Sequence, residues 1–223
     1  MVPEEGKNTG IVVKNLAKSF RNQTVLDNVS ICAPEGSRVV LVGPSGAGKS
    51  TLLRIIAGLA LPDVGEVYLG GRLVSTPAWC LEPRRRDVGF VFQNPTLWPH
   101  MTITDNIMFG LAEQPKQATR QQVQALLAKA RISHIAHKYP DQISGGEAKR
   151  AALIRSIAPG PRFLLVDEPF ANLDGATKQA LLELLLAIVG ESGTTLLYVT
   201  HDADEIQQVG GEIVILAGRK DPV

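Results

Sequence analysis

A glycine-rich run between a β-branched segment and a helical pattern constrains this chain more than any other feature. Residues 38–42, RVVLV, are typical of a strand in the core of a sheet, and residues 43–50 read GPSGAGKS. This run matches the phosphate-binding pattern G-x-x-x-x-G-K-[ST] in full. A helical pattern follows and stops at Gly58, shortly before Pro62. Strand, glycine loop and helix in this order predict a nucleotide-binding α/β core.

The residue types in this loop suit the triphosphate of ATP together with Mg²⁺. Glycines let the backbone come close enough for successive N–H groups to donate to phosphate oxygens, and the helix N-terminus adds partial positive charge. Lys49 is expected to reach the β- and γ-phosphates, and the Ser50 hydroxyl is expected to ligate Mg²⁺. The predicted ATP-binding residues of the loop are Gly43, Pro44, Ser45, Gly46, Ala47, Gly48, Lys49, Ser50 and Thr51.

A second motif places two carboxylates at the end of an apolar strand. Residues 163–168 read FLLVDE, so Asp167 and Glu168 follow four apolar residues. Ligands of open α/β sheets bind at the carboxyl ends of the strands, which is where these side chains are expected to lie. Asp167 suits Mg²⁺, and Glu168 suits a general base or a group that orients water.

A third motif, ISGGEAKR over residues 143–150, separates this chain from other nucleotide-binding classes. The first two motifs could also belong to a kinase, a GTPase or a helicase. Ser144-Gly145-Gly146 leads into a helical pattern and so predicts a second anion-binding helix N-terminus, 23 residues before Asp167. With this motif in place, the chain resembles the ABC (ATP-binding cassette) ATPase family.

The resemblance covers residues 11–217 and follows the family's motif order. It assigns adenine stacking to Phe20, the Walker A loop to residues 43–50, the Q-loop to Gln93, the signature to residues 144–147, the Walker B acid to Asp167, the catalytic glutamate to Glu168, the D-loop to residues 172–174 and the switch to His201. It implies a catalytic set of Lys49, Gln93, Glu168 and His201, and a metal-ligand set of Ser50, Gln93 and Asp167. It also implies nucleotide contacts from Phe20, Gln93, Ser144, Gly145, Gly146 and Asp174.

Four positions depart from residues that are commoner in the family. Ile143 and Glu147 stand in place of Leu and Gln, and Asn172 and Gly175 stand in place of Ala and Pro. None of these changes removes a chemical group that ATP hydrolysis needs, so we expect an active rather than a degenerate site. Phe20 keeps a second interpretation, as a core aromatic.

The order of strand and helix patterns predicts the fold class. Short strand patterns fill residues 11–42, and GEVYLGGRLV reads as a hairpin with its turn at Gly70-Gly71. Strand signals vanish between about 94 and 160 and return near the C-terminus in alternation with helices. We expect an α/β, P-loop NTPase (RecA-like) core with an N-terminal antiparallel β portion and an inserted helical subdomain. Residues 11–223 should form one domain behind a flexible tail, residues 1–10.

Composition limits the setting in which such a chain works. The net charge is +1, from 23 basic and 22 acidic residues, so there is no global field for nucleic acid or an anionic membrane. Two cysteines do not form a disulfide framework, which favours a reduced cytoplasmic setting. The longest aliphatic stretch, residues 181–189, is about half the ~20 residues of a membrane span. A membrane partner would have to supply any pore.

The resemblance implies that two chains meet head to tail around ATP and drive a membrane transporter. The expected partners are a second ABC ATPase subunit, identical or paralogous, integral membrane permease subunits and a solute-binding protein, with no nucleic acid. Residues 92–107 and 139–146 look like importer ATPases for ions, polyamines and amino acids. We therefore expect an importer motor held peripherally on the inner face of the cell membrane. A soluble ABC ATPase that remodels a non-membrane partner and an exporter motor remain alternatives.

Several other residues carry weaker expectations. His134 and His137 have no carboxylate or cysteine nearby in sequence, so no metal site is predicted there. Residues 84–86, three arginines flanked by acids, are read as a solvated turn. Ile107 and Phe109 are expected to pack inside the helical subdomain, whereas residues 98–102 are expected to line an exposed groove that receives a short helix of a membrane partner.

Overall fold

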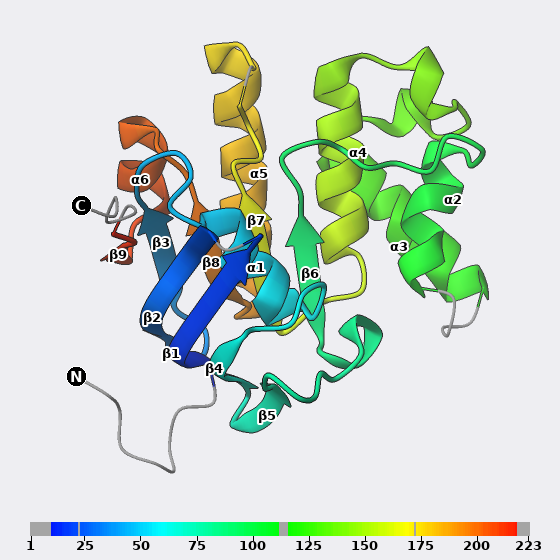
Figure 1. Ribbon diagram of the computed structural model, residues 1–223. Helices are drawn as coiled ribbons and strands as arrows, with labels where there is room; N and C mark the ends of the chain where they lie inside the picture. The colour runs from blue at the N-terminus through cyan, green and yellow to red at the C-terminus, as the bar shows by residue number, and fades with distance from the viewer. Residues whose placement is uncertain (1–9, 22, 112–115, 172, 218–223) are drawn as a thin grey trace.

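A computed structural model describes residues 10–21, 23–111, 116–171 and 173–217 of the chain, without the side chains of residues 116–118. Within them the strands form two sheets, one antiparallel and one parallel (Figure 1). The predicted α/β fold with an N-terminal antiparallel portion is therefore confirmed. Most of the predicted tail and the D-loop position Asn172 lie outside the described residues.

The antiparallel sheet has the strand order β2-β1-β4-β5. Its strands are β1 (Ile11–Phe20), β2 (Gln23–Ala33), β4 (Val64–Leu69) and β5 (Arg72–Ser75). The predicted hairpin joins β4 to β5, and its turn residues Gly70 and Gly71 have φ angles of 59° and 78°. Two consecutive positive φ angles suit the twist of a hairpin, and glycine adopts them at little steric cost. The predicted hairpin is confirmed.

The parallel sheet has the order β6-β7-β8-β3-β9. Its strands are β3 (Arg38–Val42), β6 (Val88–Val91), β7 (Phe163–Asp167), β8 (Thr195–Val199) and β9 (Glu212–Ile215). Neighbouring strands pair in parallel, so their carboxyl ends share one edge of the sheet. Gly43, Gln93, Glu168 and His201 all follow strands at that edge.

Helices cover both faces of the parallel sheet. Helix α1 (Lys49–Ala57) lies between the two sheets, where its apolar side chains join those of β1, β3 and β7 in one core (Figure 1). Helices α5 (Gly175–Ser192) and α6 (Ala203–Val209) pack on the other face. Strand β3 contributes to both cores, because Val39 and Leu41 point to α1 whereas Val40 points to α5.

The segment between β6 and β7 is helical and forms a lobe beside the parallel sheet (Figure 1). Its α-helices are α2 (Ile103–Met108), α3 (Lys116–Lys129) and α4 (Gly145–Ile157), with 3₁₀ turns η2 (Phe109–Leu111), η3 (Ser133–Ile135) and η4 (Pro140–Gln142). Buried side chains of this lobe join those of β6, β7 and α5 in a single core. The lobe is therefore packed onto the sheet rather than tethered to it.

One predicted solvated turn is wrong in part. In the 3₁₀ turn η1 (Pro83–Arg85) and the residue that follows it, Arg84 and Arg85 are exposed, but Arg86 is only 3% exposed. Its guanidinium donates to backbone carbonyls of Leu81, Val74, Ile55 and Ile56. Two of these carbonyls belong to the last turn of α1, where the regular helical bonding ends, although Ile55 O also accepts from Gly58 N. The acidic neighbours of Arg86 predicted an exposed side chain. Arg86 is buried instead, because its guanidinium donates to carbonyls of four residues in the core.

The surface after β6 also differs from its prediction. Ile107 is fully buried as expected, but Phe109 is 56% exposed and lies outside the core, with its ring centroid 4.5 Å from that of Trp98. Within residues 98–102, which were expected to line an exposed groove, Pro99 and His100 are exposed, whereas Trp98 and Met101 are half-buried. The cause is Asn106, whose side chain accepts from Trp98 N and donates to the Trp98 and Met101 carbonyls, and so holds this segment against α2.

In the part of the chain that the structure describes, no helix combines the length and the apolar character needed to cross a lipid bilayer.

Candidate functional site

The glycine loop leads into α1 with the backbone geometry that its sequence predicts. Gly48, the N-cap of α1, has φ 90°. A Cβ atom at this position would lie 2.5 Å from Leu26 Cδ2 and 2.7 Å from Val25 O, so both the backbone conformation and the space require glycine. Pro44, Ser45 and Gly46 are exposed. An exposed loop thus leads directly into a helix N-terminus, which is the arrangement that binds anions in other proteins.

Lys49 is folded over this loop. Its side chain is 7% exposed, and Nζ donates to the carbonyls of Gly43 at 2.7 Å and Pro44 at 3.0 Å. The ammonium group is therefore held at the loop backbone, where phosphate oxygens would approach the N–H groups. A cation and a helix N-terminus therefore meet at one place, which is an arrangement that suits an anion.

Two predicted metal ligands that are far apart in sequence are in contact. Ser50 Oγ donates to Asp167 Oδ1 at 3.0 Å, which joins the start of α1 to the end of β7. Burial raises the pKa of the Asp167 carboxyl, and the Ser50 hydrogen bond opposes that rise. A hydroxyl and a carboxylate oxygen are ligands that Mg²⁺ accepts, and the usual Mg²⁺ site adds only one or two protein carboxylates to phosphates and water. The donor set fits Mg²⁺.

Glu168 and His201 lie together at the same sheet edge. Glu168 Oε1 is 3.5 Å from His201 Nδ1, and His201 is exposed. Glu168 has φ 42°, a left-handed conformation that is uncommon outside glycine and clusters at functional sites. Its backbone N–H donates to Val199 O at 3.0 Å, which anchors the residue to β8. The carboxylate is thus turned toward the loop that carries His201.

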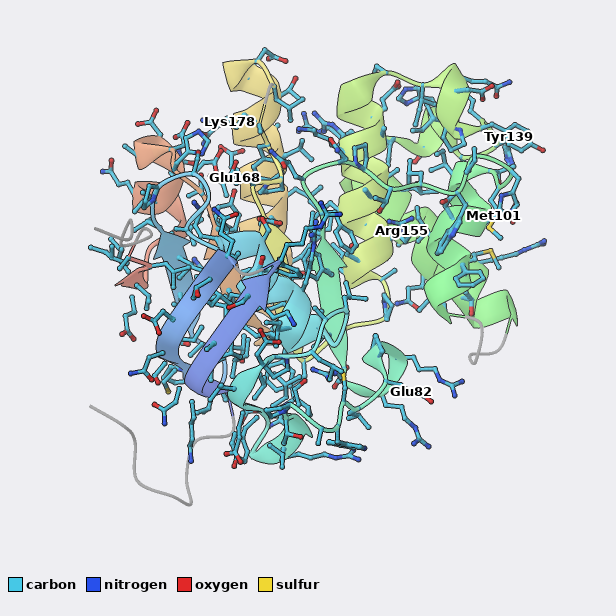
Figure 2. All side chains as sticks on the ribbon, in the orientation of Figure 1. Glu82, Met101, Tyr139, Arg155, Glu168 and Lys178 are labelled. Atoms are coloured by element: carbon cyan, nitrogen blue, oxygen red, sulfur yellow. The ribbon has the colours of Figure 1, made fainter. Side chains whose placement is uncertain are left out.

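A cavity of about 250 Å³ begins at this pair, lined by Glu168, Phe170, Ala171, Leu173, Lys178, Thr200, His201, Asp202 and Glu205. Glu168 and Lys178 lie at the same end of the core in Figure 2. The Lys178 ammonium pairs with Asp202 and lies 3.6 Å from Glu205 Oε1. Lys178 holds the pKa of the Asp202 carboxyl below its ordinary value.

Sequence reasoning missed this lysine, although it holds the segment after His201. Asp202 accepts at its Oδ1 from the backbone N–H groups of Asp204 and Glu205 and so caps α6, and Tyr198 OH donates to Glu205 Oε2 at 2.8 Å. The sequence offered one signal, three acids (Asp202, Asp204 and Glu205) at the start of a helix with no cation nearby in sequence. The required cation comes from the first turns of α5.

The remaining predicted residues on the core side also lie at surfaces. Gln93 is exposed, two residues after the end of β6. Phe20 ends β1, is 49% exposed, and has the Lys18 ammonium 5.3 Å from its ring centroid, so the core interpretation of this ring is not favoured. Asp174 is the N-cap of α5 and accepts from Thr177 N at 3.0 Å.

The Ser-Gly-Gly motif lies on the helical lobe instead of beside the glycine loop. Ser144 is the N-cap of α4, both Ser144 and Gly145 are exposed, and a Cβ atom at Gly145 would meet nothing within 4 Å. Figure 1 shows α4 at the side of the parallel sheet, apart from α1. The two helix N-termini that the sequence predicts as anion sites therefore lie on separate parts of the fold.

Comparisons with known proteins agree on one family. The family model described as ABC transporter matches residues 26–171. The sulfate/thiosulfate import ATP-binding protein CysA of Synechocystis sp. is 40% identical over 212 residues, covering 94% of this chain and 59% of that protein. The protein of the same name from Vibrio vulnificus is 45% identical, covering 92% and 60%. The chain spans about three fifths of the length of these curated relatives.

Solved structures give the same result. A dimeric structure of a post-hydrolysis state of the ATP-binding cassette MJ0796, bound to ADP and Pi, superposes with a TM-score of 0.84. The two sequences are 31% identical, and the match covers 94% of this chain and 97% of that chain. A second dimeric structure of MJ0796, described as a bacterial ABC transporter cassette, gives a TM-score of 0.83 at 33% identity. The predicted P-loop fold is confirmed over nearly the whole chain.

Proposed function

Because this chain belongs to the ABC transporter family of ATP-binding proteins, we propose that it binds and hydrolyses ATP as the motor subunit of a membrane importer. One observation carries the proposal, the contact between Ser50 Oγ and Asp167 Oδ1 at 3.0 Å beside the glycine loop. It joins the two groups that a Mg²⁺–nucleotide site needs, from elements far apart in sequence. The import direction is supported by the relatives, whose names describe sulfate and thiosulfate import.

The glycine loop and Lys49 bind the phosphates. The N–H groups of the loop and of the first turn of α1 donate to phosphate oxygens, and the Lys49 ammonium exchanges its loop carbonyls for the β- and γ-phosphates. Ser50 and Asp167 would hold Mg²⁺, with Gln93 approaching from the end of β6. When bound there, Mg²⁺ would supply positive charge that stabilises the negative charge on the phosphate oxygens. Phe20, exposed at the end of β1, stacks on adenine.

Glu168 and His201 complete the site on its γ-phosphate side. The Glu168 carboxylate orients and polarises the attacking water, and its left-handed backbone and Val199 hydrogen bond keep it in place. His201, 3.5 Å from Glu168, donates to the γ-phosphate. Lys178 is a positioning residue for this histidine, because it ties the adjacent Asp202 to α5.

The two separate helix N-termini require a second chain. Ser144, Gly145 and Gly146 bind the γ-phosphate of ATP held on the glycine loop of a partner, which is identical or paralogous, and Asp174 lies at the same face. The proposal is supported by the separation of α4 from α1 in Figure 1 and by the dimeric state of the similar cassettes. Each closure then encloses two ATP molecules.

The lobe surface around Trp98 is proposed to receive integral membrane permease subunits. We define this Trp98 surface by Trp98, Met101, Phe109 and Arg155, where the indole lies 4.5 Å from the Phe109 ring and 4.8 Å from the Arg155 guanidinium. Figure 2 places Met101 and Arg155 on the lobe. Aromatic residues, methionine and arginine are enriched at interface cores. A permease bound here would hold the protein at the inner face of the cell membrane. The solute-binding protein would then meet the same permease from the outer side.

The first experiment tests the nucleotide chemistry. Purified protein should hydrolyse ATP only when Mg²⁺ is present, and Ser50→Ala and Asp167→Asn should each lower turnover by roughly tenfold or more, because each removes a predicted metal ligand. Ser30→Ala, which changes an exposed serine of β2, serves as the matched control. Hydrolysis that is unaffected by both site variants would exclude this assignment.

The second experiment tests the transport role. The permease and solute-binding subunits are first identified by their co-purification with the tagged protein from its native membranes. Trp98→Ala combined with Met101→Ala should leave the ATPase of the isolated subunit within a few-fold while assembly or transport fails. Trp79→Ala is the matched control, because Trp79 is 47% exposed and lies outside the lobe. Normal assembly and transport in the double variant would exclude the Trp98 surface as the coupling site.

A further inference from the structure

His134 lies next to the signature, although it comes from a different turn of the lobe. It belongs to the 3₁₀ turn η3, which the fully buried Ile135 anchors in the lobe core. Its Nε2 is 2.7 Å from Glu147 Oε1, across 13 residues of sequence. This contact supplies the carboxylate partner that the sequence around His134 lacks, but a single carboxylate does not form a metal site.

Glu147 in turn controls the position of Ser144. Its Oε2 accepts from both the backbone N and the side-chain Oγ of Ser144, each at 2.8 Å, while Ser144 Oγ accepts from Glu147 N at 3.3 Å. These bonds form a capping box at the start of α4. They also lower the pKa of Glu147 to about 2, with the Ser144 backbone as the largest cause, so the side chain is an anion at neutral pH.

A carboxylate at position 147 can oppose phosphate binding at the start of α4, whereas an uncharged glutamine would not repel the phosphate. A carboxylate in the first turn favours the helix, but it lies beside the same N–H groups that a phosphate would use. If Glu147 moved toward Gly145 or Gly146, it would compete with that phosphate for donors and repel it. The next two cations on α4 do not restrain it, because Lys149 donates to Ala171 O and Arg150 to Ala130 O.

We infer that His134 is a positioning residue of the signature: its Nε2–H holds Glu147 Oε1 away from the glycines, and so leaves the Gly145 and Gly146 N–H groups free for the γ-phosphate of the partner's ATP. The inference rests on the proposed two-chain arrangement and adds a residue to it. The donor atom is present in neutral imidazole as one tautomer and in imidazolium, so the bond does not require a charged ring. The signature needs His134 because residue 147 is a glutamate, and a glutamine at this position would remove that need.

The experiment uses the full chain carrying Glu168→Gln, in which we expect ATP-bound dimers to persist, and measures the dimer dissociation constant in ATP by sedimentation. His134→Ala should raise the dimer dissociation constant by roughly tenfold. Each of the two sites should contribute about threefold, which is typical for the loss of one exposed ion pair, and the two contributions multiply. ATP affinity of the monomer should not change, since the glycine loop is untouched. His134→Gln, which keeps an N–H donor, should restore most of the loss, and His137→Ala, an exposed histidine of the same lobe, should have no effect.

The deciding arm adds Glu147→Gln to the same chain. In that background His134→Ala should no longer weaken the dimer, because no carboxylate remains to be held. An equal loss in both backgrounds, or no loss in either, overturns the role of His134 while leaving the proposed function intact. Failure of the Glu168→Gln chain to form any ATP-dependent dimer overturns the two-chain sandwich itself, and the inference with it.

Discussion

The two halves of the proposed site differ in their exposure to solvent. On the core side Lys49 and Asp167 are each 7% exposed, and their bonds to the loop carbonyls and to Ser50 join separate parts of the core. On the lobe side Ser144 and Gly145 are exposed, although Ser144 is bonded to Glu147 in the same turn of α4. A half-site that is complete within one chain can bind nucleotide alone, whereas the exposed half acts only when another molecule covers it. The predictions below test this division.

The largest effect is expected at Glu168. Glu168→Gln keeps the shape of the side chain and its backbone anchor but removes the base, so hydrolysis should fall by about 100-fold or more. ATP binding should stay within a few-fold, because the phosphate-binding groups are untouched. Stopped-time ATPase assays and nucleotide titration separate the two quantities, and light scattering should detect a longer-lived ATP-bound dimer. Wild-type turnover in this variant would show that the base lies elsewhere.

The next effect concerns stability and separates the core from the lobe. Arg86→Met should lower the free energy of unfolding by about 3 kcal/mol, since it removes the guanidinium hydrogen bonds to the buried carbonyls of Leu81, Val74, Ile55 and Ile56. Urea denaturation measures this change. The Trp98→Ala and Met101→Ala double variant should lose less, because both side chains are half-buried. If the free energy of unfolding fell in the lobe variant and not in Arg86→Met, the core would not be the more tightly bonded part of the molecule.

A smaller effect is expected for the adenine ring contact. Phe20→Ala should weaken nucleotide binding by roughly 1–3 kcal/mol, a range taken from stacking of bases on aromatic side chains. Discrimination between purines should remain poor, because every purine presents a π-face. Calorimetric titration with ATP and GTP checks both points. Unchanged affinity with a sharp fall in melting temperature would assign this half-exposed ring to packing instead.

The smallest effect is a pH dependence at the signature. The pKa of Glu147 is lowered from 4.5 to about 2, chiefly by its bonds to Ser144. A lowered pKa in the folded state adds stability above the unfolded value, and that contribution is lost as the pH falls from about 4.5 to about 2. Glu147→Gln should therefore show a shallower loss of stability over this window than the wild-type chain. Equal slopes in urea denaturation would mean that the capping box is not formed.

The sequence predicted the parts of the site that follow from local order. A strand, a glycine loop and a helix must place Lys49 at an anion site, and parallel strands must bring Asp167 to the same edge as Ser50. Arg86, Lys178 and His134 could not be predicted in the same way, because their partners lie on other elements. Acidic neighbours misleadingly suggested that Arg86 was solvated. The expected burial of Ile107 is confirmed, but no spacing rule marks where α2 ends and leaves Phe109 outside the core.

The shared core between lobe and sheet limits how the lobe can move. Helix α4 is attached to β6 by the Ser156 hydroxyl, which donates to Phe90 O at 2.7 Å, and to the segment after β7 by Lys149. A hinge needs a thin connection that absorbs the rotation, and here apolar side chains continue from lobe to sheet. Relative motion must occur by shear, with small slides between packed side chains that keep their contacts. Because packed side chains leave little free space between lobe and sheet, we expect a sub-ångström displacement at Gln93 to move the Trp98 surface as well.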